Sequence, residues 1–291
     1  MRISMTTVMI RNDRPSRRGY LYALAFLLLI LLSGLAVQTA QAQDDPNTPS
    51  ASGTNPSGTL PENPLYLPLV ALNAGQARVF DAIPVLEPPV DRPAAAHGDL
   101  NLALRGYTNT VANLTLIDVN GDVDEHAPQL AGLFATPRLP TFQAAYRVYD
   151  WNWGCSAEGC RGEPLADPPV TLLEMVVTQG ETLHIPTRTP DIYGDDYKAL
   201  VLYAETQRIT LAYTRQDTAA VGYLVHIEDL TVDPALVALY NELNLAGRSR
   251  LPALHNGEVL GLASGATISV AIRDTGAFMD PRVRKDWWKG Y

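Results

Sequence analysis

From about Asp99 onward the chain is a succession of short apolar runs, and this pattern limits the fold more than any other feature of the sequence. Many runs carry β-branched or aromatic residues at alternate positions, and Gly, Asp or Pro separates one run from the next. Such alternation is typical of strands with one buried face. The strands that we expect are Leu100–Arg105, Leu114–Ile117, Tyr146–Tyr149, Val170–Val177, Thr182–Ile185, Ala199–Tyr203, Arg208–Tyr213, Gly222–Ile227 and Thr267–Ile272.

Only one segment has the pattern of a helix. Asp233 provides an N-cap, Pro234 suits the first turn, and Gly247 follows the last apolar position. Between them an apolar stripe recurs at helical spacing, formed by Leu236, Leu239, Tyr240 and Leu243. One helix among so many strands predicts an all-β fold, a single β-barrel or sandwich-like domain over residues 99–291 with one short helix and long loops.

The residues before this domain have a different character. Residues 1–42 have the pattern of a secretory signal peptide, with arginines, then the apolar run 21–37, then the small-residue site Ala40–Ala42. We therefore expect a secreted or cell-surface protein; the alternative is that residues 21–37 remain as an uncleaved membrane anchor. Residues 43–64 are rich in Pro, Ser, Thr and Asn and predict a disordered linker, and residues 65–98 predict an extended proline-rich segment.

The charge excludes one class of partner. The formal net charge is −9 at pH 7, and the part after the signal peptide is more negative still, because residues 1–42 hold five Arg and one Asp. An acidic surface does not attract the phosphate backbone, so we expect no nucleic-acid partner. The sequence also contains no P-loop, dinucleotide fingerprint or Gly-x-Ser-x-Gly elbow, and we expect no cofactor.

The C-terminal part carries a resemblance to a known family. Gly257–Gly261 precedes the apolar run Ile268–Asp274, which is followed by Gly276–Pro281. This order resembles the end of the lysostaphin-like M23 peptidase domain, and Ala199–Ile227 is similar to the central hairpin of that domain. The resemblance covers about the last third of the chain and implies a β-barrel of the duplicated-hybrid-motif type. The chain as a whole also resembles uncharacterised exported bacterial proteins, from which no activity follows.

The zinc chemistry of that peptidase family depends on residues that this chain largely lacks. The family holds its metal with a His-x-x-x-Asp pair and a His-x-His element, and the second element falls on Ile268–Val270, which contains no His. Hydrolytic zinc needs three protein ligands and an open position. The remaining candidates are His97, Asp99 and His226, and we keep a divergent zinc-dependent cell-wall peptidase as the alternative function.

The segment around the two cysteines is the strongest candidate for a binding site. Cys155 and Cys160 predict a disulfide in an exported protein, closing a very short loop. Trp151 and Trp153 alternate along an extended segment, so they share a face and can stack on a sugar ring or clamp a peptide. Rim groups that could hydrogen-bond a ligand are provided by Glu158 and Arg161. The competing interpretation is that both tryptophans merely cover the end of the barrel.

Two further segments have an unusual charge pattern. The acidic stretch that contains Asp118, Asn120, Asp122 and Asp124 has the ligand density of a calcium loop, although the spacing also suits a solvated hairpin turn. The tail 282–291 combines four cations with three aromatic residues. We expect it to dock on its own acidic domain with Trp287 and Trp288 packed; the alternative is contact with an anionic polymer or a membrane surface.

Taken together, these patterns favour an exported, non-catalytic β-domain that binds a cell-wall or other extracellular glycan or peptide through residues 151–160. Membrane contact is expected only through an uncleaved N-terminal segment.

Overall fold

Two antiparallel sheets contain the strands of residues 78–87 and 93–291, which the computed structural model describes. These residues belong to one compact unit, Ala71–Tyr291. The strands are β1 (Asp81–Pro84), β2 (Tyr107–Asn109), β3 (Phe142–Asn152), β4 (Cys160–Pro164), β5 (Leu172–Val176), β6 (Thr182–His184), β7 (Ala199–Glu205), β8 (Arg208–Ala212), β9 (Tyr223–Glu228), β10 (Leu230–Val232), β11 (Arg250–Leu254), β12 (Val259–Ala263), β13 (Thr267–Asp274) and β14 (Ala277–Met279).

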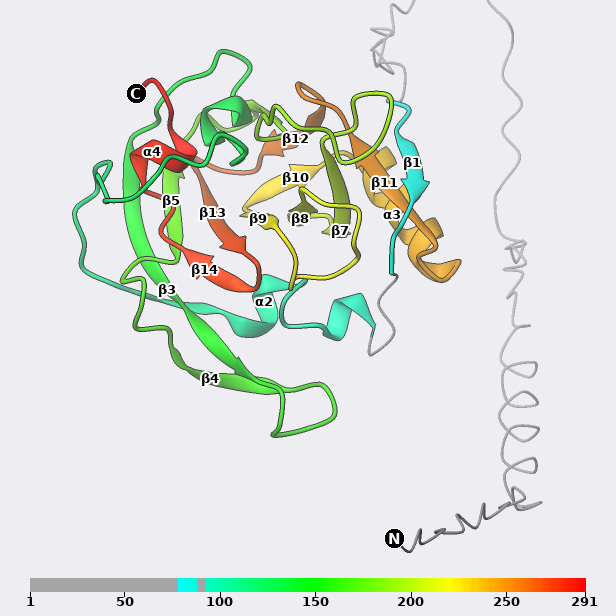
Figure 1. Ribbon diagram of the computed structural model, residues 1–291, viewed down its shortest axis with the longest axis horizontal. Helices are drawn as coiled ribbons and strands as arrows, with labels where there is room; N and C mark the ends of the chain where they lie inside the picture. The colour runs from blue at the N-terminus through cyan, green and yellow to red at the C-terminus, as the bar shows by residue number, and fades with distance from the viewer. Residues whose placement is uncertain (1–77, 88–92) are drawn as a thin grey trace, which may run out of the picture. The chain divides into compact units, whose positions relative to one another are not determined.

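The larger sheet has eleven strands and the smaller one has three. The path through the larger sheet is β1–β11–β7–β8–β9–β13–β5–β3–β2, while β14 pairs with β13 and β4 pairs with β3. The smaller sheet has the order β10–β12–β6. Figure 1 shows β13 between β9 and β5, and the β3–β4 hairpin extending beyond the rest of the sheet.

Alternation along the strands gives the larger sheet two different faces, as β13 illustrates. Ile268, Val270 and Ile272 belong to the main hydrophobic core. Ala271, which points to the opposite face, packs in a second, smaller cluster with Leu102, Val148, Leu172 and Phe278. This second cluster supports the part of the sheet on which the candidate site is built.

The all-β class is confirmed, and most of the expected strands are present. The alternative of a β-barrel is wrong, because the described strands do not close on themselves. Closure requires the two ends of a sheet to pair. Here β1 and β2 end the path without pairing to one another.

Two expected strands are wrong. Leu100–Arg105 forms a short helix, α2 (Leu102–Arg105), because the Asn101 side chain accepts a hydrogen bond from Ala103 N at 3.2 Å and caps its start. Gly106, at φ 64°, ends it. Leu114–Ile117 contributes only an isolated bridge between Ile117 and Val283. The cap of α2 is local, whereas Ile117 pairs with a residue that is far away in the sequence.

The predicted helix is confirmed as α3 (Pro234–Leu245), the longest helix in the described residues. The Asp233 side chain accepts a hydrogen bond from Ala235 N at 2.9 Å, and Leu236 and Tyr240 are its buried residues. The other helical segments are single turns: η1 (Ala94–Ala96), η2 (Leu130–Leu133), α2 and α4 (Arg284–Trp287).

The predicted signal peptide, residues 1–42, and the predicted linker, residues 43–64, lie outside the described residues. Of the extended segment 65–98, residues 78–87 and 93–98 are described, and they contain β1 and η1. Nowhere in the described ranges does a helix have the length and apolar composition to cross a membrane.

Candidate functional site

Trp151 and Trp153 lie at the end of β3, beside an open hollow of about 630 Å³. Their ring centroids are 6.1 Å apart and their ring planes meet at 69°. The imidazole of His97 lies 4.9 Å from the Trp153 ring, at 66°. Trp153 remains 37% exposed. Three aromatic rings, none parallel to its neighbour, therefore form one wall of the hollow.

The other walls come from segments that are far apart in the sequence. Charged side chains are provided by Asp99, Arg105, Asp150 and Arg273. Thr218, Ala219 and Ala220 of the β8–β9 connection and Gly276 of the β13–β14 turn complete the lining. Two arginines and two aspartates face the same space, so their formal charges cancel.

The two arginines act as braces between these segments. Arg105 forms an ion pair with Asp99 and donates to Gly98 O at 2.8 Å and to Tyr149 O at 3.1 Å. Arg273 Nη1 lies 2.8 Å from Asp99 Oδ1, and its Nε donates to Gly276 O at 3.1 Å. These bonds join the 97–99 turn to β3 and to the β13–β14 turn.

Asp99 is held in its charged form by these braces. Burial would raise the pKa of its carboxyl, but the positive charges of Arg273 and Arg105 outweigh burial and lower that pKa below its usual value. A carboxylate with a lowered pKa and two guanidinium partners is a structural anion. It is poorly suited to give up a proton as a general acid.

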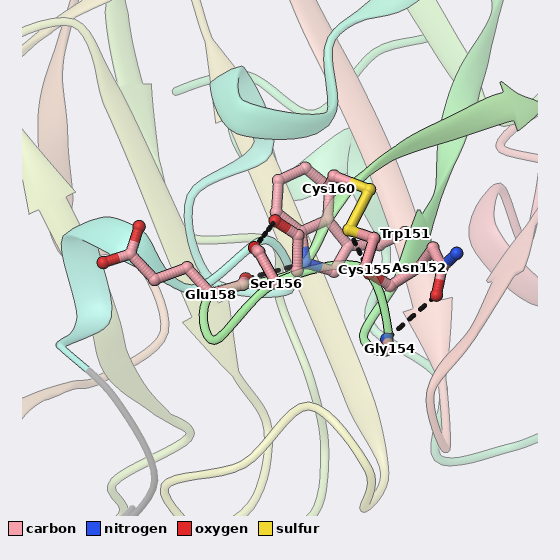
Figure 2. Close-up of a disulfide and its surroundings, with 8 residues drawn as sticks. Trp151, Asn152, Gly154, Cys155, Ser156, Glu158 and Cys160 are labelled. Carbon is pink, nitrogen blue, oxygen red and sulfur yellow. Dashed lines mark hydrogen bonds between the residues drawn. A yellow bond between two sulfur atoms is a disulfide. The ribbon is translucent and has the colours of Figure 1, made fainter.

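The disulfide loop positions Trp151 (Figure 2). Cys155 and Cys160 are joined, as predicted, and Asn152 pairs with Cys160 at the start of the β3–β4 hairpin. Inside the loop Trp151 Nε1 donates to Glu158 O at 3.2 Å, and Ser156 Oγ donates to Gly159 O at 2.8 Å. The loop thereby satisfies the indole N–H of Trp151, which lines the hollow.

Two glycines allow the Trp151 ring to lie where it does. A Cβ at Gly98 would come within 2.6 Å of the ring, and one at Gly159 would come within 2.2 Å of its Nε1. A Cβ atom essentially never lies this close to an atom to which it is not bonded. The ring position therefore requires the absence of a side chain at both residues.

We predict that Gly98→Ala displaces the Trp151 ring. Overpacking typically costs about 1–3 kcal/mol, and Gly98 has no positive φ to add backbone strain. Gly265→Ala is the matched control, because no atom lies within 4 Å of its Cβ position. Urea unfolding and tryptophan fluorescence should change for Gly98→Ala alone, and equal behaviour of the two variants would contradict the packing argument.

The predicted rim residues do not line the hollow. Glu158 contributes its backbone carbonyl to Trp151, as described above. Arg161 donates to Leu104 O at 3.2 Å and places its guanidinium 5.2 Å from the centre of the Tyr149 ring. The structure thus brings together Trp151 and Trp153 but gives Glu158 and Arg161 a role in supporting the loop.

The candidate zinc residues have other partners. His97 Nδ1 accepts from Asp99 N at 3.2 Å, and Asp99 pairs with two arginines. His226 is buried, and its Nδ1 lies 2.9 Å from Thr210 Oγ1, which itself donates to Leu100 O. Across residues 78–87 and 93–291, no three or more His, Cys, Asp or Glu side chains are placed to hold a metal ion.

The candidate calcium residues are engaged by the C-terminal tail. Asp118 Oδ1 accepts from Arg284 at 2.8 Å. Lys285 Nζ donates to the carbonyls of Asn120 and Asp122, at 3.1 and 2.7 Å. Asp124 accepts from the Tyr223 hydroxyl through its carboxylate and from Lys289 through its carbonyl. An ammonium group thus occupies the position between carbonyls that a bound cation would take.

The tail docks on its own domain, as predicted. Trp287 and Trp288 are buried, and their indole N–H groups donate to Asp280 O at 2.9 Å and Pro281 O at 2.8 Å. Three of the cations, Arg284, Lys285 and Lys289, meet the acidic loop at the rim. The fourth, Arg282, is buried and pairs with Asp280, so the expectation of four cations at the rim is wrong for this residue. The docked tail thus contributes two tryptophans to the core.

Arg105, Asp150 and Arg273 line the hollow but are not among the site residues expected from the sequence. For Arg273 a signal exists, because a charge at the end of the apolar run Thr267–Ile272 is buried only with a partner. No local sequence pattern indicates that Arg105 pairs with Asp99 and Asp150, or that Arg273 pairs with Asp99. Their convergence depends on how β3, α2 and β13 are placed in the sheet.

No protein-family model matches the chain, and no curated protein matches its sequence. The resemblance to the lysostaphin-like domain therefore rests on the residues quoted above.

Proposed function

We propose that this is an exported, non-catalytic β-domain that binds a neutral saccharide in the hollow beside Trp151 and Trp153. The observation that carries the proposal is the aromatic wall, in which two indole rings and an imidazole lie close together at steep angles. Aromatic faces offer a large apolar surface that can accept the C–H face of a sugar ring. The disulfide and the signal-peptide pattern support an extracellular location.

The charges of the hollow favour a neutral ligand. Asp99 and Asp150 offset Arg105 and Arg273, and the Asp99 carboxylate is already shared between the two guanidinium groups. An anionic polymer would meet no uncompensated positive charge. A saccharide needs only hydrogen-bonding groups at the edge of an apolar platform, and Asp150 and Thr218 provide them.

The same geometry supports binding rather than turnover. Glycoside hydrolysis uses a pair of carboxyl groups, one of them a general acid with a raised pKa. Of the two carboxylates here, Asp99 has a lowered pKa and serves as the centre of an ion-pair network. No observation favours the peptidase alternative, since His97, Asp99 and His226 are engaged separately.

The test is the affinity of the purified domain for defined oligosaccharides. Intrinsic fluorescence titrations would use tetra-N-acetylchitotetraose, cellotetraose and maltotetraose, with tetraalanine as the peptide comparison. We expect at least one saccharide to bind and Trp153→Ala to weaken it about tenfold, because stacking contributes about 1–2 kcal/mol.

Tyr193→Ala is the matched control, since Tyr193 is 38% exposed and does not line the hollow. It should bind as the unmodified protein does. Binding of tetraalanine without any saccharide would replace the glycan with a peptide ligand, and binding of none would refute the proposed function.

A further inference from the structure

A second hollow adjoins the same tryptophans. Its volume is about 750 Å³, and it shares Asp150, Trp151 and Trp153 with the first. Its remaining walls come from the β3–β4 hairpin and the segment after it, including Glu163, Pro164 and Leu165. This hairpin extends beyond the main sheet in Figure 1, and both hollows are lined by Trp151 and Trp153.

The two hollows differ in charge. Asp150 and Glu163 are the charged residues among the described lining of the second hollow, and no Lys, Arg or His is found there. The Asp150 side chain is 65% exposed and lies 3.9 Å from Arg105, so it is only partly compensated. Glu163 is exposed. The first hollow is balanced, whereas the second carries a negative excess beside an aromatic wall.

We propose that the two hollows are adjacent subsites for one oligosaccharide chain, with a neutral unit in the first and a cationic amino sugar in the second. This inference rests on the proposed function and names its substrate class, a chain of amino sugars that is partly de-N-acetylated. The tryptophan pair forms a ridge that the chain crosses, because Trp151 and Trp153 line both hollows.

The chemistry of the second hollow fits an ammonium group. A cation near an indole face is attracted by the ring electrons, and nearby carboxylates add a Coulombic attraction that weakens as salt is added. An N-acetyl group at the same place carries no positive charge, so neither attraction would act on it. The hollow therefore discriminates between an acetylated unit and a free amine through Glu163 and Asp150.

The experiment compares two tetramers that differ by a single charge: tetra-N-acetylchitotetraose and the same tetramer with one terminal unit de-N-acetylated. Calorimetric titrations at pH 6 and low salt would give both affinities. We expect the de-N-acetylated tetramer to bind at least fivefold more tightly, and this preference to shrink in 0.5 M NaCl.

Glu163→Gln should remove most of the preference for the de-N-acetylated tetramer, because it removes one of the two carboxylates of the second hollow. Glu158→Gln is the matched control, since Glu158 is an exposed acid of the same hairpin loop that lines neither hollow. It should keep the preference. Because only a surface carboxylate changes to an amide, both variants should fold.

The outcomes separate the two proposals. Equal binding of the two tetramers, or a preference that persists in Glu163→Gln, would overturn the amino-sugar subsite and leave the saccharide site standing. Binding of neither tetramer, together with no binding of the other neutral saccharides, would refute the proposed function and the subsite with it.

Discussion

Asp217→Ala is expected to lower the free energy of unfolding by about 3–5 kcal/mol, because it leaves a buried guanidinium without its counter-ion. Asp217 is 1% exposed and Arg248 is 7% exposed. Arg248 Nε and Nη2 lie 2.6 and 2.7 Å from the two carboxylate oxygens of Asp217. Arg248 also donates to the Tyr240 hydroxyl and to Leu202 O, so it cannot turn toward solvent without losing these bonds.

Urea denaturation of the variant would measure the loss. Glu242→Ala is the control, because Glu242 is an exposed acid on α3 and alanine favours helix; its effect should stay within about 0.5 kcal/mol. The double variant Asp217→Ala/Arg248→Met should recover much of the stability, since it removes both buried charges together. A loss below about 1 kcal/mol for Asp217→Ala would show that the pair is not what holds this region.

The Asp217–Arg248 pair also bears on the candidate site. Asp217 immediately precedes Thr218, Ala219 and Ala220, which form a wall of the first hollow. The pair anchors this wall to α3 and β7 through Tyr240 and Leu202. Loss of saccharide binding in Asp217→Ala would accordingly accompany the loss of stability.

The second large effect is a dependence of stability on pH that His226 imposes. Burial, together with the positive charges of Arg273 and Arg105, lowers the pKa of His226 from 6.5 to about 3. Above pH 6.5 the residue is neutral in both the folded and the unfolded chain. As pH falls below that value the unfolded chain takes up a proton that the folded chain does not, so acid favours unfolding.

Each pH unit in this window changes the free energy of unfolding by about 1.4 kcal/mol for one such group. The difference in stability between the unmodified protein and His226→Gln should therefore shift by roughly 2 kcal/mol between pH 6.5 and 4.5. Carboxylates such as Asp99 are present in both proteins, so their contribution to the pH dependence of stability cancels in the difference. Gln can still donate to Thr210 Oγ1, which limits other changes.

Urea denaturation at a series of pH values would provide the two curves. Curves that remain parallel from pH 7 to pH 4.5 would mean that His226 takes up its proton in the folded state. That result would contradict the burial of an uncharged imidazole next to two arginines.

The sequence alone determined the features that depend on neighbouring residues. The period-two pattern of Thr267–Ile272 identifies a strand because alternate side chains point to opposite faces of a sheet. Asp233, Pro234 and the stripe that ends before Gly247 identify α3 because capping and helical spacing are both local. Trp151 and Trp153 share a surface because they are two residues apart. Cys155 and Cys160 can join because they are five residues apart.

The tertiary structure decided what these local elements build. Leu100–Arg105 alternates like a strand, yet it forms a helix in which Leu102 packs in the second cluster and Arg105 donates to Gly98 O and Tyr149 O. The tail and the acidic loop, more than 150 residues apart, pair because the sheet places them together.

Only part of the candidate site could be predicted from the sequence. The tryptophans could be found from their spacing, but a hollow needs walls, and its walls are His97, Arg105, Thr218 and Arg273. These residues belong to four segments whose proximity follows from the strand order of the larger sheet and from the ion pairs to Asp99. The local sequence pattern determines on which face of the sheet a side chain lies. Only the order of the strands determines which other segments lie next to that face.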